Sequence, residues 1–198
     1  MSELLGALAE ILERGRLDGT RPLVLQEPQR SAFERLTMSC PSEMVALRLG
    51  PDDYLRILAE TRLVRRLPDY VIFAAPPPSR GAGKKKGRSE LVMQVLVCEL
   101  KSGAKGAEEA RHQLRRGRLL GEYLLGLAAL HQEASAPAAH QVEYCGLVCV
   151  PRALYRKGGT KPEAAVNANR EWDALGQMWV HRVTDGGEVQ TEQFLVRD

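Results

Sequence analysis

Long apolar runs are absent from this chain of 198 residues. No stretch approaches the roughly 18 uninterrupted apolar residues that a membrane-spanning helix needs. The first residues have neither a basic segment nor a small-residue cleavage site, so they lack the pattern of a secretory signal peptide. We therefore expect a cytoplasmic protein without a membrane partner.

Cysteine and histidine are both scarce, with four residues of each. Four scattered cysteines do not make a disulfide framework, and a domain of this size does not need one. Cys98, Cys145 and Cys149 lie in apolar runs typical of buried strands, where a free thiol behaves as a small hydrophobic residue. No histidine stands at a metal-ligand spacing from these thiols, which argues against a zinc site.

The remaining composition is that of an ordinary globular domain. Hydrophobic residues make up 44% of the chain, charged residues 27%, and the net charge is +3. A chain of this length can bury one sizeable core without dividing. We expect a single domain over 1–198, with a core over about 40–150 and a C-terminal extension over about 151–198.

Hydrophobic spacing predicts a mixed fold. Helical spacing covers four segments, which are 3–14, 31–36, 52–58 and 107–131. Strand patterns cover six segments, which are 45–49, 68–73, 91–100, 143–150, 178–183 and 189–196. The last two are expected to form a C-terminal hairpin turned by Asp185-Gly186-Gly187. Because the long helix bridges two strands in parallel, the fold class is α/β, or α+β with a mixed sheet.

Positive charge is concentrated in residues 80–118. This segment holds eleven basic and four acidic residues, a net charge of +7, so the rest of the chain carries −4. Lys and Arg that neutralise phosphates supply most non-specific affinity for nucleic acid. A solvated charged face is the alternative interpretation. The residues expected to contact nucleic acid lie on a loop and on one helix face, namely Lys84, Lys85, Lys86, Arg111, Arg115 and Arg118.

Three charged residues are expected to meet where two paired strands end. Glu99 and Lys101 share one face of the 91–100 strand because side chains alternate along a strand. Asp69 opens the 68–73 strand, and antiparallel pairing of the two strands places it beside Glu99. Such charges are costly on an apolar surface unless they satisfy each other or something bound between them. Asp52, in a second Pro-Asp pair, is better explained as a helix N-cap.

The order of these residues resembles that of a known nuclease superfamily. Pro68-Asp69, then Glu99-Leu100-Lys101, then Gln113 on the following helix resembles the PD-(D/E)xK nucleases with the restriction-endonuclease-like fold, over roughly 60–150. The resemblance implies a restriction-endonuclease-like core with flanking helices. A tyrosine commonly follows the glutamine by one helical turn in the RecB-like subgroup, and here that place is Gly117.

The chemistry assigns a role to each residue of this motif. Asp69, Glu99 and the carbonyl of Leu100 are expected to hold Mg²⁺ or Mn²⁺, which prefer oxygen ligands. Lys101 is expected to position or deprotonate the attacking water. By the resemblance, Gln113 helps to place the water or the phosphate, and alternatively it only caps a strand end. An additional acid is sought among three residues, Glu10, Glu34 and Glu43, with Glu43 preferred.

We therefore expect a metal-dependent nuclease that acts on DNA more than on RNA. The chain has little room for a separate recognition domain, so targeting is expected to need a homodimer or a partner such as an ATPase or helicase. Defence, repair and mobile-element complexes are the expected settings. The alternative is a non-catalytic nucleic-acid-binding or scaffold subunit that retains the fold, but three converging charges are expensive to keep without chemistry.

Overall fold

The computed structural model describes residues 3–12, 16–19, 22–26, 33, 35–49, 67–76, 91–101, 107–151 and 170–195. The α-helices in these residues are α1 (Glu3–Ile11) and α3 (Ala107–His131), and the 3₁₀ helices are η1 (Ala139–Gln141) and η3 (Thr191–Phe194). None of these helices is long and apolar enough to cross a membrane. The segments 52–58 and 77–90, with the predicted short helix and most of the lysine-rich loop, lie outside the described residues.

The described strands form two mixed sheets. The larger sheet contains, in spatial order, β1 (Arg16–Gly19), β4 (Met44–Arg48), β5 (Tyr70–Ala74), β6 (Met93–Leu100), β7 (Val142–Val150), β9 (Met178–Thr184) and β8 (Arg170–Asp173). The smaller sheet contains β10 (Glu188–Gln190), β3 (Leu36–Ser39) and β2 (Leu23–Leu25). The mixed α/β fold expected from the sequence is confirmed.

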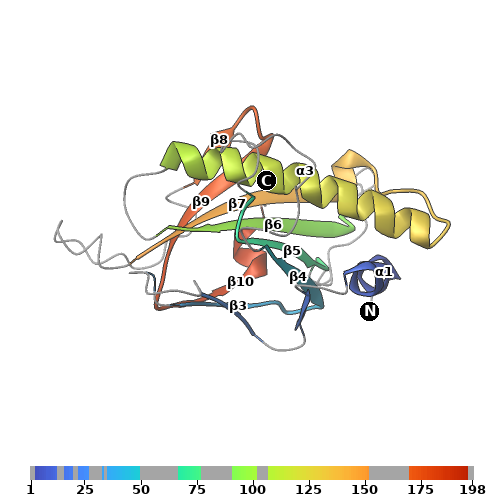
Figure 1. Cartoon of the computed structure of the whole chain (residues 1–198), viewed down its shortest axis with the longest axis horizontal. Helices are drawn as coiled ribbons and strands as arrows, with labels where there is room; N and C mark the ends of the chain where they lie inside the picture. The colour runs from blue at the N-terminus through green and yellow to red at the C-terminus, as the bar shows by residue number, and fades with distance from the viewer. Residues whose placement is uncertain are drawn as a thin grey trace, which may run out of the picture.

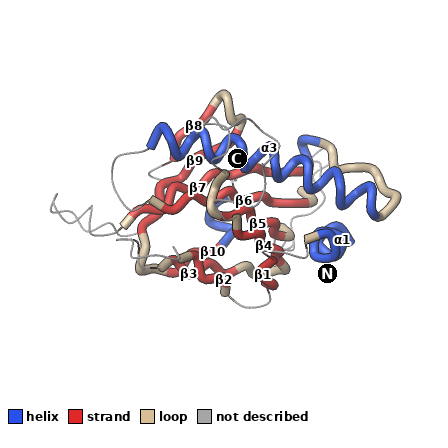
Figure 2. Tube along the Cα trace, in the orientation of Figure 1, coloured by secondary structure: helices blue, strands red, loops and turns tan. Residues whose placement is uncertain are grey.

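The larger sheet is covered on both faces. Helix α3 crosses one face and joins β6 to its parallel neighbour β7, while the small sheet lies on the other side of the large one (Figures 1 and 2). Val95 and Val97 of β6 belong to the core beneath α3, whereas Leu96 and Cys98 belong to the core shared with the small sheet. Every residue of β6 is therefore buried, which explains its almost continuous apolar sequence.

The predicted C-terminal hairpin is wrong in its pairing. Strand β9 pairs antiparallel with β8, and β10 pairs parallel with β3 in the small sheet. Gly186, with a φ of 72°, directs the chain from one sheet to the other, and its N–H donates to the carbonyl of Arg35. Residues 191–194 form η3 rather than a strand, and Phe194 of this helix is buried in the core shared with the small sheet.

The short helix predicted over 31–36 is wrong at its C-terminal end, which is the start of a strand. Leu36 is the first residue of β3, and Phe33 and Leu36 are both buried in the core shared with the small sheet. Pairing of β3 with β2 and β10 therefore overrides the helical spacing at this point.

Candidate active site

Asp69 and Glu99 meet at one end of the β5–β6 pair, where β5 begins and β6 ends. Tyr70 pairs with Cys98, so the next residues outward, Asp69 and Glu99, face each other across this antiparallel ladder. Asp69 is two residues from Val71, and Glu99 is two residues from Val97. Because side chains alternate along a strand, both acids lie on the same face as these valines, which belong to the core beneath α3. The Asp69 carboxylate accepts a hydrogen bond from the backbone N–H of Leu100, with Oδ2 to N at 2.7 Å. The expected juxtaposition of the two acids is present.

The backbone of Leu100 is oriented toward Asp69. Its N–H points to the β5 side, because it donates to Asp69, whereas the N–H of Lys101 points to the β7 side and donates to the carbonyl of Cys149 at 2.8 Å. The N–H and C=O of one strand residue point to the same neighbour. The Leu100 carbonyl is therefore directed to the side on which Asp69 lies.

Lys101 connects Glu99 to helix α3. Its Nζ lies 2.6 Å from Oε1 of Glu99 and donates a hydrogen bond to Oε1 of Gln113 at 2.8 Å. The Gln113 amide in turn donates to the carbonyl of Leu67 at 3.1 Å, in the segment that leads into β5. Gln113 therefore orients the lysine and also fastens the chain just before Asp69.

Glu99 is in an electrostatically unusual position. Only 3% of the residue is exposed. Burial, together with the negative charge of Asp69, raises the pKa of Glu99 from 4.5 to about 8, although Lys101 and Gln113 act to lower this pKa. Its Oε2 is buried and accepts no hydrogen bond from the residues that the structure describes. An unsatisfied buried acceptor costs free energy, which is typical of a site that binds something further.

The donor set fits a hard divalent cation. Within the described ranges, no three His, Cys, Asp or Glu side chains lie close enough to hold a metal together, so the site offers two carboxylates as candidate side-chain ligands. Mg²⁺ is commonly bound through one or two carboxylates while it keeps several waters. Asp69, Glu99 and the Leu100 carbonyl are a set of this kind, and a cation would satisfy Oε2 of Glu99.

The raised pKa of Glu99 predicts how stability depends on pH. Between pH 4.5 and about 8 the folded protein binds a proton at Glu99 that the unfolded chain has released. The contribution of Glu99 to the free energy of unfolding should therefore decrease as pH rises through this window. Urea denaturation of the metal-free protein across the window measures it, with Glu99→Gln as the reference that lacks the titrating group. Equal pH dependence in the two proteins would contradict the raised pKa.

Gly117 allows α3 to lie close to β6. A Cβ at this position would be 2.3 Å from Cγ1 of Val97 and 2.5 Å from Cγ of Pro68. Real side chains do not approach so closely, so only glycine permits this helix position. Gln113 lies one turn earlier on the same helix, so the close approach brings it within reach of Lys101.

Gly117→Ala is expected to destabilise the protein by about 1–2 kcal/mol. Overpacking a core costs roughly 1–3 kcal/mol, and the better helix propensity of alanine returns at most about 1 kcal/mol. Gly126→Ala on the same helix is the matched control, because a Cβ at that position would have no neighbouring atom within 4 Å. That variant should gain about 1 kcal/mol. Equal stability changes in the two variants, measured by denaturation, would refute the close packing at Gly117.

Two of the three candidates for an additional acid, Glu10 and Glu43, are not brought to this site. Glu43 precedes Met44, which pairs with Ala74, so it lies at the opposite end of β5 from Asp69. The carbonyl of Glu43 accepts the N–H of Ala75, which fixes that position. Glu10 is paired with His131 at the end of α3, and Glu34 lies outside the described residues. Strand β4 runs antiparallel to β5, so its first residues lie beside the last residues of β5. Sequence spacing alone does not show this.

The arginines of α3 have partners within the protein. Arg115 makes a bidentate ion pair with buried Asp173 of β8, at 2.7 and 2.8 Å, and this bond lowers the pKa of Asp173. Arg111 pairs with Glu171, and Arg118 pairs with Glu122 and lies 4.8 Å over the ring of Tyr144. The contacts of Arg111 and Arg115 fasten the β8–β9 hairpin to α3. Lys84, Lys85 and Lys86 lie outside the described residues.

Arg182 is a residue near this site that the sequence pattern does not single out. It lies in β9 in register with Val148 of β7, which is in register with Glu99. Its one sequence signal is a charge within an otherwise apolar strand pattern. Its relation to Glu99 depends on the register of the parallel strands β6, β7 and β9, which cannot be read from the sequence.

Comparisons of the chain with family models, with curated proteins and with solved structures find no match.

Proposed function

We propose that this chain is a metal-dependent nuclease that hydrolyses phosphodiester bonds, with DNA as the expected substrate. The observation that carries the proposal is the convergence of Asp69, Glu99 and Lys101 where β5 begins and β6 ends. One carboxylate oxygen of Glu99 is buried there and lacks a hydrogen-bond partner among the described residues. The sequence order of these residues and Gln113, which resembles that of the PD-(D/E)xK superfamily with its restriction-endonuclease-like core, supports the same proposal.

Each residue has a role in this proposal. Asp69, Glu99 and the Leu100 carbonyl would hold Mg²⁺ or Mn²⁺, which when bound neutralises charge on a phosphate and lowers the pKa of a coordinated water. Lys101, oriented by Gln113 at 2.8 Å, holds the attacking water or offsets the charge that develops on the phosphate. The low-dielectric surroundings of Glu99 strengthen these electrostatic effects.

The setting of this activity is part of the proposal. We place the protein in the cytoplasm, with a second copy of the chain or a partner such as an ATPase or helicase for targeting. Analytical ultracentrifugation with and without DNA tests the homodimer, and a monomer under both conditions would leave targeting to a partner protein.

A cleavage assay with Asp69→Asn tests the proposal. Labelled single-stranded and duplex DNA, and RNA of the same sequences, are incubated with the purified chain in Mg²⁺, in Mn²⁺ and in EDTA. Cleavage is expected in Mg²⁺ or Mn²⁺ only, and Asp69→Asn should reduce it by at least about 100-fold because a ligand is lost. The asparagine oxygen can still accept the Leu100 N–H, so the fold is preserved. Cleavage that persists in the variant would come from a contaminant and would overturn the assignment.

A further inference from the structure

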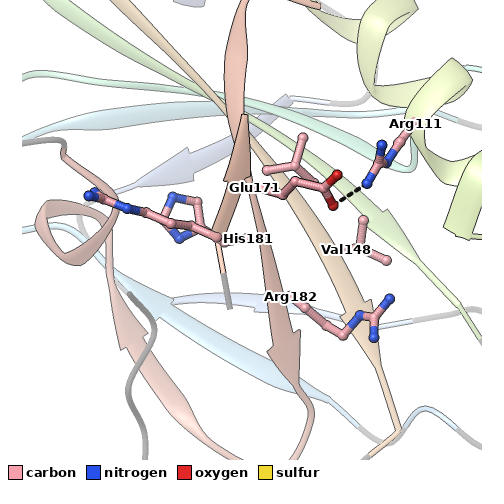
Figure 3. A pocket seen from close by; sticks show the side chains of 7 residues that line it. Arg111, Val148, Glu171, His181 and Arg182 are labelled. Carbon is pink, nitrogen blue, oxygen red and sulfur yellow. Dashed lines mark hydrogen bonds and ion pairs between the residues drawn. The ribbon is translucent and has the colours of Figure 1, made fainter. Parts of the chain in front are cut away.

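A pocket of about 360 Å³ lies beside the candidate active site. Helix α3 contributes Arg111 to it, and β7, β8 and β9 contribute Val148, Glu171, Val180 and Arg182. Figure 3 shows the side chains of Arg111, Glu171, Val148 and Arg182 gathered together, with His181 apart from them. Arg170 also borders the pocket, but its guanidinium lies 4.6 Å over the ring of Trp179, so it is engaged elsewhere.

Two residues that line the pocket, Val148 and Arg182, are in strand register with Glu99. Glu99 of β6 pairs with Val148 of β7, and Val148 pairs with Arg182 of β9, so the three residues form one row across the sheet. Val148 and Val180 belong to the core beneath α3, which places this row on the α3 face. With strands about 4.8 Å apart, Arg182 is about 10 Å along the sheet from Glu99.

The pocket has positive charge available for an anion. Arg182 is exposed, and no ion pair or hydrogen bond joins its side chain to another described residue. Arg111 is held by Glu171, an exposed carboxylate that a stronger anion could displace. Arginine presents a planar fork of donors that matches phosphate oxygens, and Val148 and Val180 provide an apolar floor on which such contacts are strengthened.

We propose that this pocket binds a backbone phosphate of the substrate strand, a few nucleotides from the cleaved bond, with Arg182 as the principal contact and Arg111 as the second. The proposal rests on the proposed function for the identity of the strand. One strand carries a phosphate for every 3.4 Å or so of helix axis, and consecutive phosphates lie further apart than this along the winding backbone, so a distance of about 10 Å corresponds to at most roughly three nucleotides. Arg182 thus becomes a positioning residue that fixes the register of the strand over Glu99.

Binding measurements with Arg182→Gln test this pocket. The affinity of a short fluorescent DNA strand is measured by anisotropy in EDTA, where no cleavage occurs, over a series of salt concentrations. Arg182→Gln is expected to weaken binding about tenfold and to flatten the salt dependence by about 0.7 in log–log slope, the value for one phosphate contact on a single strand. Arg35→Gln, an exposed arginine next to the small sheet, is the control with the same charge change. Equal effects of the two substitutions would overturn the proposal.

Replacing single phosphates locates the contact. Strands in which one linkage at a time is a neutral methylphosphonate should show one linkage whose neutralisation weakens binding to the wild type, and this effect should be lost in Arg182→Gln. Glu171→Gln should change affinity in the opposite direction, because it releases Arg111. If inorganic phosphate binds but no linkage is sensitive, the pocket serves a free anion and the proposal is wrong.

The cleavage assay separates this proposal from the proposed function. A sensitive linkage without any metal-dependent cleavage would leave the pocket in place and refute the nuclease. Cleavage without a sensitive linkage would support the nuclease and refute the pocket.

Discussion

Glu99→Gln is expected to lower the rate of Mg²⁺-dependent cleavage by at least about 100-fold while the protein stays folded. Loss of a hydrogen bond next to a metal already costs roughly 10–100-fold, so loss of a ligand should cost at least as much. The fold should survive, because burial raises the pKa of Glu99 to about 8, which favours the protonated carboxyl group before metal binds. Glutamine has nearly the same shape and charge as that protonated form. Cleavage rate, Mn²⁺ calorimetry and thermal unfolding measure the three quantities.

Glu43→Gln is the matched control for this substitution. It makes the same chemical change at the far end of the same sheet, next to Ala75 rather than Asp69. Its cleavage rate and Mn²⁺ affinity should equal those of the wild type. If Glu99→Gln bound Mn²⁺ and cleaved DNA as the wild type does, Glu99 would not be a ligand.

Those parts of the site that depend on local pattern could be predicted from the sequence. The apolar run that ends in Glu99 and Lys101 is β6, and the helix predicted over 107–131 has these bounds in the structure. Pairing of β5 with β6 follows from their adjacency in the chain, and alternation then places Asp69 opposite Glu99. Gln113 points inward because it shares a helix stripe with Gly117.

Features that depend on distant pairing could not be predicted. The position of Glu43 close before a strand favours it as an acid, but only the antiparallel register of β4 shows which end of the sheet it occupies. The helical spacing of the α3 arginines predicts contacts with phosphates. It does not show that β8 lies beside this helix and pairs two of these arginines with Glu171 and Asp173. For the same reason β10 lies outside its expected hairpin, since its partner β3 lies about 150 residues away in the chain.

The intramolecular pairs on α3 change what its positive charge can do. Arg115 is committed to a buried, bidentate partner, so releasing it to a phosphate would leave Asp173 buried without its counter-charge. Arg111 pairs with an exposed acid and can exchange partners at lower cost. Of these two arginines, Arg111 is therefore better suited to reach a ligand, and it borders the pocket shared with Arg182.

Lys101→Met is expected to reduce turnover by about 10²- to 10⁴-fold, the usual contribution of a group that transfers or holds a proton in the transition state. Metal binding should be retained at saturating Mn²⁺, because both carboxylates and the Leu100 carbonyl remain. Removing the ammonium 2.6 Å from Glu99 has two opposing effects on the metal. It removes repulsion of the cation, and it makes ionisation of Glu99 less favourable. Single-turnover cleavage and Mn²⁺ calorimetry at about pH 8, near the raised pKa of Glu99, separate turnover from binding.

Lys101→Arg distinguishes the two ways in which the lysine can act. Arginine keeps the positive charge but cannot lose its proton. If Lys101 acts by charge alone, Lys101→Arg should recover part of the rate that Lys101→Met loses, whereas if it takes a proton from water, both variants should be equally slow. The amide of Gln113, 2.8 Å from Nζ, would still be present to orient either side chain. Wild-type cleavage by Lys101→Met at saturating metal would leave Lys101 as a charge partner of Glu99 only, with no part in the chemical step.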